Sequence, residues 1–85
     1  MKSFNYVVKD QEGIHARPAT LLVQNAKKFK SSVQIVFGDK KADAKRIFSI
    51  MALGAKQGAD LTFNISGEDE EAAYNELKSF VEANF

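Results

Sequence analysis

Residues 61–81 read LTFNISGEDEEAAYNELKSFV, in which a strand pattern gives way to a helix pattern. Apolar residues alternate with polar ones from Leu61 to Ile65, and this period of two is typical of a strand with one buried face. Gly67 ends the strand, and the acidic run 68–71 suits the electropositive start of a helix. The apolar stripe of that helix comprises Ala73, Leu77, Phe80 and Val81. The stretch therefore predicts a strand followed by an amphipathic helix.

The same two patterns occur in the same order between residues 4 and 29. Phe4, Tyr6 and Val8 alternate with less apolar neighbours and predict a strand. From Ala16 onwards the apolar residues are three or four positions apart, which predicts a helix. The core face of this helix would hold Ala19, Leu22, Val23, Ala26 and Phe29. Its polar, positively charged outer side would hold Arg17, Thr20, Gln24, Lys27 and Lys28.

Between these two units lies a predicted hairpin followed by a short helix. Val33 to Phe37 alternate, and the pair Gly38-Asp39 suits a tight turn. The charged segment 40–44 reads as an edge strand, because its lysines and aspartate would discourage pairing with another chain. Residues 45–53 are predicted to form a helix that ends at Gly54, where glycine can adopt a left-handed cap.

The predicted order of elements is strand, helix, hairpin, helix, strand, helix (βαββαβα). Strands with one apolar face and interspersed helices favour an α+β open-faced sandwich, with a four-stranded antiparallel sheet covered on one face by three helices. The length of 85 residues allows one core, so residues 1–85 are expected to form a single domain. Small size and the charged edge strand favour a monomer.

Composition excludes several kinds of chemistry. The chain has no cysteine and one histidine, so we expect no disulfide, no metal site and no cofactor. A formal net charge of +1 does not favour nucleic acid as a partner. The longest apolar run, residues 50–55, is too short to span a membrane, and no signal segment opens the chain. We therefore expect no membrane insertion and a cytoplasmic location.

The predicted helix at residues 45–53 is too apolar for its length. Its apolar residues point in several directions on about two turns, so they cannot all face one core. Ile50 and Leu53 are assigned to the core, whereas Phe48 and Met51 are predicted to be exposed.

The only histidine, His15, stands where the helical period begins, within the segment GIHARPA at residues 13–19. The start of a helix leaves N–H groups unpaired and favours an anion such as phosphate. Pro18 fits the first turn, where its missing N–H costs little. A neutral imidazole nitrogen can attack phosphorus, and Arg17 could donate hydrogen bonds to the phosphoryl oxygens. The simpler alternative is a histidine that only caps the helix.

The segment GIHARPAT at residues 13–20 resembles the active-site signature of HPr, the histidine-containing phosphocarrier family of the bacterial phosphoenolpyruvate-dependent sugar phosphotransferase system. The resemblance continues through Ala44-Lys45 and the run MALGAKQG at residues 51–58. It implies that His15 accepts a phosphoryl group on Nδ1 from enzyme I and donates it to enzyme IIA of a sugar permease. Arg17, with Ala16, would bind the phosphate. Such a protein is a carrier and not an enzyme.

The resemblance also implies a surface that docks both partner proteins. Ile47, Phe48 and Met51 match its apolar patch. Thr20, Gln24 and Lys27 would supply the polar surround.

One position departs from the Gram-positive members of this family. These members carry a regulatory serine in a Lys-Ser-Ile pattern, whereas this chain has Lys45-Arg46-Ile47. Arg46 cannot accept phosphate from a serine kinase, so we expect no control of this kind.

Three other functions stay open on the sequence alone. The first is a phosphocarrier of a nitrogen-regulatory branch, and the second is a non-catalytic interaction domain in which His15 is a helix cap. The third is a nucleic-acid module that stacks bases on an open sheet. The phase of the strands argues against this last alternative, because the aromatic residues fall on the face expected to meet the helices. These residues are Phe4, Tyr6, Phe37 and Phe63.

Overall fold

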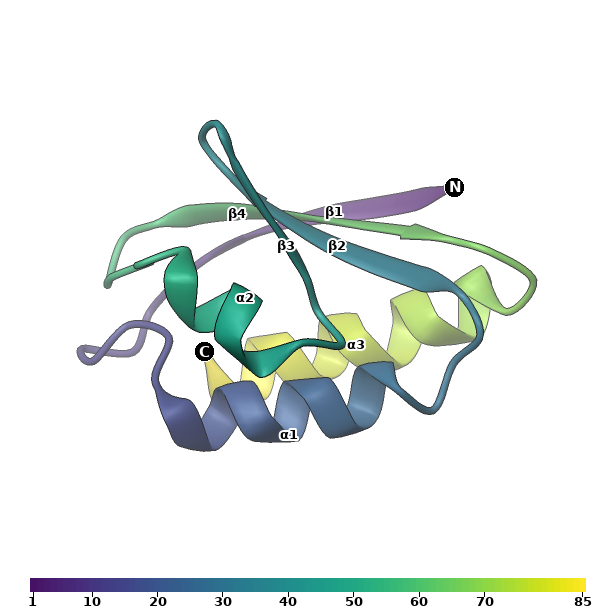
Figure 1. Ribbon diagram of the computed structural model, residues 1–85, viewed down its shortest axis with the longest axis horizontal. Helices are drawn as coiled ribbons and strands as arrows, with labels where there is room; N and C mark the ends of the chain where they lie inside the picture. The colour runs from purple at the N-terminus through teal and green to yellow at the C-terminus, as the bar shows by residue number, and fades with distance from the viewer.

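The computed structural model describes residues 1–85 and contains four strands and three helices in the order βαββαβα. The strands are β1 (Lys2–Val7), β2 (Ser32–Phe37), β3 (Lys40–Asp43) and β4 (Asp60–Ser66); the helices are α1 (Ala16–Ala26), α2 (Ile47–Ala52) and α3 (Glu70–Asn84). The strands form one antiparallel sheet in the order β1-β4-β2-β3. All three helices lie on the same side of this sheet (Figure 1). The predicted open-faced sandwich is confirmed.

The core lies between the sheet and the helices, where 21 buried residues form one cluster. Phe4 of β1 and Phe63 of β4 are register partners, and their rings stack with centroids 4.7 Å apart. Such cross-strand aromatic pairs stabilise a sheet beyond the area they bury. Phe4, Tyr6 and Phe63 are buried and Phe37 is partly buried, so these aromatic residues do not form a stacking surface for bases.

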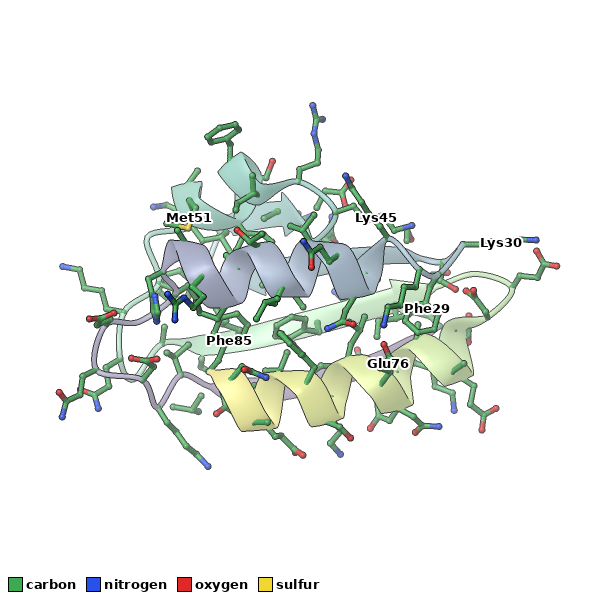
Figure 2. All side chains as sticks on the ribbon, turned by 90° about the horizontal axis from the view of Figure 1, so that it is seen from below. Phe29, Lys30, Lys45, Met51, Glu76 and Phe85 are labelled. Carbon is green, nitrogen blue, oxygen red and sulfur yellow. The ribbon has the colours of Figure 1, made fainter.

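Helices α1 and α3 run antiparallel beneath the sheet (Figures 1 and 2). The apolar stripes place Ala19, Leu22 and Ala26 of α1 and Ala73, Leu77 and Val81 of α3 in the core. The chain departs from the prediction at the C-terminal end of α3. Phe80 is only partly buried, and Phe85 takes the buried place, with its ring edge-on to that of Phe80 at 6.3 Å.

Two further helix boundaries differ from the sequence prediction. Helix α1 ends at Ala26, so Phe29 is outside it and Lys27 is its C-cap. Helix α2 spans only Ile47–Ala52, because the Lys45 backbone N–H binds the Asp43 carboxylate in a turn before it. Gly54 follows α2 with φ +64°, which confirms the left-handed cap.

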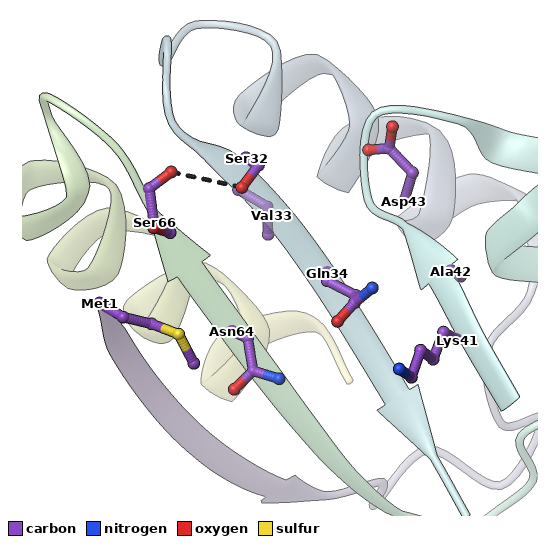
Figure 3. Close-up of a pocket in the computed structure, with 9 residues that line it drawn as sticks. All are labelled: Met1, Ser32, Val33, Gln34, Lys41, Ala42, Asp43, Asn64 and Ser66. Carbon is purple, nitrogen blue, oxygen red and sulfur yellow. Dashed lines mark hydrogen bonds between the residues drawn. The ribbon is translucent and has the colours of Figure 1, made fainter. Parts of the chain in front are cut away.

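The uncovered face of the sheet is polar. A hollow of about 390 Å³ lies on it over β2 (Figure 3). It is lined by Met1, Ser32, Val33, Gln34, Lys41, Ala42, Asp43, Asn64 and Ser66. This hollow has no residue in common with the surroundings of His15, which lies on the helical side of the molecule. No helix of the chain has both the length and the apolar character that crossing a membrane requires.

Candidate functional site

His15 is the N-cap residue of α1. Its backbone is extended (φ −120°, ψ 174°), and its carbonyl oxygen accepts the first helical hydrogen bond, from Ala19 N at 3.1 Å. Its side chain makes no capping hydrogen bond and is 34% exposed. A plain N-cap residue would use its side chain to satisfy one of the free amides of the first turn. The imidazole instead leaves the amides at the helix start available to an anion, while part of the ring stays exposed.

The loop before His15 is held in place by its own backbone. Gly13 has φ +70°, which a residue with a Cβ rarely adopts, and its N–H donates to Asp10 O at 2.9 Å. Any Cβ at this position would lie 2.5 Å from the carbonyl oxygen of Ala55. Ile14 is buried, and its N–H donates to that same oxygen at 3.1 Å. The close approach of this loop to Ala55 therefore fixes where His15 emerges.

Two carboxylates flank the imidazole. Asp10 Oδ2 lies 3.2 Å from His15 Nε2, and Glu12 Oε2 lies 3.6 Å from Nδ1. The pKa of the Asp10 carboxyl is lowered, chiefly because the backbone N–H of Glu12 donates to it and also because His15 does. At neutral pH Asp10 is therefore an ionised hydrogen-bond acceptor beside the ring.

A shallow hollow of about 180 Å³ opens beside His15. Its lining consists of Asp10, His15, Arg17, Pro18, Leu21 and Asn84. Arg17 is exposed and is placed with His15, as the sequence predicted. Ala16, the first helical residue, is also exposed. The hollow is large enough for a phosphoryl group, which would meet the start of α1 and the guanidinium together.

Sequence reasoning missed four residues near His15. Asp10 and Glu12 are only five and three positions before His15, so their proximity in the chain was a usable signal. Leu21 is 41% exposed, and its position one residue before the buried Leu22 was a signal that it points outward. Asn84 comes from the far end of α3, and only the antiparallel packing of α1 and α3 brings it here.

Asp10, Glu12 and His15 also offer three potential metal-ligand atoms within 4.8 Å of one another, a group that the sequence analysis did not anticipate. The two carboxylates approach different nitrogens of the one ring. A single ion could not use both of these contacts. Hydrogen bonding to the ring accounts for the Asp10 contact without a metal.

The surplus apolar residues of α2 divide as predicted. Ile50 and Leu53 are buried at 0% and 2% exposure, whereas Phe48 is 86% and Met51 39% exposed. Ile47 is partly buried against the core. Helix α2 packs against α1, and Met51 lies beside the first turns of α1 (Figure 2). The exposed Met51 of α2 therefore adjoins the end of α1 that carries His15.

The predicted polar surround follows one side of α1. Thr20 and Gln24 are exposed and one helical turn apart, and Thr20 Oγ1 donates to Ala16 O at 2.8 Å. Lys27, as the C-cap, continues this side with helical φ and ψ (−68°, −16°). Helical rise places it about 18 Å along the axis from His15. Lys27 thus lies at the far end of the surface, away from His15.

A partly exposed imidazole at the start of a helix, on an open-faced sandwich with exposed apolar side chains on α2, is the arrangement expected of a small histidine phosphoryl-carrier domain. The family model for the "PTS HPr component phosphorylation site" matches residues 2–83. The chain belongs to the HPr family of the phosphotransferase system.

Relatives of known identity agree with this assignment. The chain is 42% identical over 83 residues to the phosphocarrier protein HPr of Mycoplasma pneumoniae, covering 96% of this chain and 94% of the relative. Among solved structures it resembles HPr from Thermoanaerobacter tengcongensis, with a TM-score of 0.92, 41% identity and coverage of 100% and 96% of the two chains. A structure described as an HPr dimer from the same organism has a TM-score of 0.77 at 41% identity, with coverage of 98% and 95%.

Membership defines what the chain does. It is a phosphocarrier of sugar transport, which receives a phosphoryl group from enzyme I and transfers it to enzyme IIA. It carries the group transiently as phosphohistidine and is not itself a catalyst.

Proposed function

We propose that His15 is the residue on which this chain carries the phosphoryl group. It is the only histidine, and it stands at the start of α1 with its side chain partly exposed and without a capping role. This last observation carries the proposal. A histidine used only to cap α1 would bind the amides of its own first turn, and His15 leaves them free.

The free backbone N–H groups at the start of α1 would donate hydrogen bonds to the phosphoryl oxygens. The N–H groups of Ala16 and Arg17 have no acceptor within the helix, because the fourth helical residue, Ala19, is the first to bind His15 O. Pro18 has no N–H to contribute. The Arg17 guanidinium adds charged donors from the same hollow. Together these groups stabilise the negative charge that develops on the phosphoryl oxygens during transfer.

The partner proteins dock on the apolar side chains of α2 and the outer side of α1. Phe48, at 86% exposure, is the largest unburied apolar side chain and would be the anchor, with Ile47 and Met51 beside it. Thr20, Gln24 and Lys27 form the polar rim along α1. One surface next to His15 then serves enzyme I and enzyme IIA in turn.

The proposal is tested by following the relay with purified components. The wild-type protein is incubated with phosphoenolpyruvate and enzyme I, then separated and offered to enzyme IIA. We expect one phosphoryl group to be gained, to be acid-labile and base-stable, and to pass to enzyme IIA. His15→Ala should gain none while remaining folded by circular dichroism, since His15 is not buried. Label retained by His15→Ala would reject His15 as the carrier residue.

We also propose that residues 1–85 act as a single-domain monomer in the cytoplasm, where its relay partners would meet it. One continuous core supports the monomer, as does the short edge strand β3, which carries Lys40, Lys41 and Asp43. Light scattering after size exclusion should give the mass of one chain. A stable mass of two chains, as in the relative described as a dimer, would reject it.

A further inference from the structure

The two carboxylates beside His15 are held very differently. Asp10 Oδ1 accepts a hydrogen bond from the backbone N–H of Glu12 at 2.9 Å. The backbone N–H of Asp10 donates to Phe85 O, also at 2.9 Å. Phe85 is buried, so this anchor is part of the core. The Glu12 side chain is 72% exposed and makes no hydrogen bond. Asp10 is therefore fixed against the ring, whereas Glu12 can swing away.

The fixed carboxylate determines which ring nitrogen bears the proton. An ionised carboxylate can only accept, so its 3.2 Å contact with His15 is a hydrogen bond only when Nε2 carries hydrogen. In a neutral imidazole the other nitrogen then has a free lone pair. At 3.6 Å, Glu12 is too far from Nδ1 to form a hydrogen bond and does not compete for the proton.

We propose that Asp10 is a positioning residue for phosphoryl transfer, which holds the Nε2–H form of His15 and aims Nδ1 at the incoming phosphorus. This inference rests on the proposed role of His15. During transfer the Nδ1 lone pair forms the N–P bond while the bond from phosphorus to the donor atom of enzyme I breaks, its electron pair staying on that donor. The ring keeps its Nε2 proton and gains positive charge, which the adjacent Asp10 carboxylate stabilises. Glu12 leaves the Nδ1 side as the phosphoryl group arrives.

The Asp10→Asn variant provides a sharp test because it is nearly the same size. Because an amide NH₂ group cannot accept from the Glu12 N–H, the amide oxygen would keep the place of Oδ1 and the NH₂ group would face Nε2. The amide would then donate to the Nε2 lone pair and move the ring proton to Nδ1. An aspartate that orients a catalytic imidazole in hydrolases is replaced by asparagine at a cost of ~10⁴-fold in kcat through the same change of tautomer.

The tautomer is measured by NMR of protein with ¹⁵N-labelled histidine, at a pH where the ring is neutral. We expect Nε2–H in the wild type and in Glu12→Gln, which removes the neighbouring charge but not the hydrogen bond. Asp10→Asn should show Nδ1–H, and Asp10→Ala a mixture of the two forms. Dominant Nδ1–H in the wild type, or the wild-type spectrum in Asp10→Asn, would overturn the inference.

Transfer kinetics from enzyme I give the second readout. Asp10→Ala should lower kcat roughly 10-fold with little change in KM, and Asp10→Asn should lower kcat further, because its Nδ1 is protonated. Glu12→Gln should not lower kcat. An equal loss of kcat in Glu12→Gln and Asp10→Asn would show that the loss comes from the removed negative charge. It would reject a positioning role for Asp10. These outcomes are distinct from a failure of the proposed function, which would appear as phosphate on His15→Ala.

Discussion

The carboxylate of Asp69 accepts hydrogen bonds from both the backbone N–H and the hydroxyl of Ser31, at 2.9 and 2.6 Å. Its other oxygen accepts from the Lys30 N–H at 2.9 Å. Asp69 is the N-cap residue of α3 but makes no side-chain hydrogen bond to its own helix. Its side chain instead joins the start of α3 to the loop between α1 and β2, far from the end of α1 that carries His15.

Removal of the Asp69 carboxylate should destabilise the fold without affecting phosphoryl transfer. In Asp69→Ala, the buried Ser31 hydroxyl and two loop amides lose their acceptor, and unpaired buried donors are costly. We expect the melting temperature to fall by several degrees. Ser31→Ala is the matched control, because it removes one donor and leaves the carboxylate its two amides. A smaller loss in Asp69→Ala than in Ser31→Ala would contradict this description.

The same group predicts a dependence of stability on pH. The Ser31 hydroxyl and the Lys30 amide lower the pKa of Asp69 from 3.8 to about 2. A lowered folded-state pKa stabilises the fold above the unfolded value of 3.8, and this contribution is lost as the pH falls towards 2. The difference in the free energy of unfolding between the wild type and Asp69→Asn should therefore be constant near neutral pH and shrink below pH 3.8. Urea unfolding at several pH values measures this difference. A difference that grows in acid would contradict the stabilising role of the Asp69 carboxylate.

Phe48 should contribute to docking and not to stability. With 86% of its surface exposed, Phe48→Ala removes few core contacts, so the free energy of unfolding should change by less than about 0.5 kcal/mol. Binding to enzyme I and enzyme IIA should weaken roughly 10-fold, because in each complex Phe48 would be an anchor residue that the partner covers. Ile50→Ala, in the same helix but fully buried, should instead cost about 2–5 kcal/mol of stability. Calorimetric titration and chemical unfolding separate the two effects. Unchanged affinities for Phe48→Ala would remove α2 from the docking surface.

Arg46 should prevent serine-kinase control of the protein. It is the N-cap residue of α2. By the resemblance drawn from the sequence, a regulatory serine would be expected at this position. We expect no incorporation of phosphate when the wild type is exposed to a serine kinase of that system and ATP. Arg46→Ser is the positive control, since it restores the Lys-Ser-Ile pattern. Stoichiometric labelling of Ser49 or any other serine in the wild type would contradict the expectation.

The element types and the sheet face followed from local patterns, because the periods of two and 3.6 report directly which side of an element is buried. The helix ends did not. Apolar spacing continued α1 to Phe29, but the chain turns after Ala26, and the Lys45 ammonium donates to the partly buried Phe29 carbonyl at 2.9 Å. Phe85 is buried, whereas Phe80 is only partly buried against the core. The end of α3 reaches the loop before His15, where Phe85 O accepts from Lys9 N and Asp10 N. Such long-range contacts leave no periodic signal.

The site was only partly predictable. His15, Arg17 and the exposed residues of α2 could be selected because single histidines and surplus apolar residues stand out in a short chain. The proximity of Asp10 to His15 in the chain was the one available signal, but an aspartate in a polar loop is ordinary, so its contact with the ring was not predicted. Its position against Nε2 depends on the bonds that Phe85 O accepts from Lys9 N and Asp10 N. The residue proposed to aim the imidazole is thus set by tertiary contacts.

Peptide-level location of the phosphate gives the most direct test of carriage by His15. After brief incubation with phosphoenolpyruvate and enzyme I, the protein is digested at alkaline pH and its peptides are sequenced by mass spectrometry. We predict one phosphoryl group, on the peptide that contains His15, and its loss after mild acid treatment. Phosphate on any other residue, or none despite active enzyme I, would contradict the assignment.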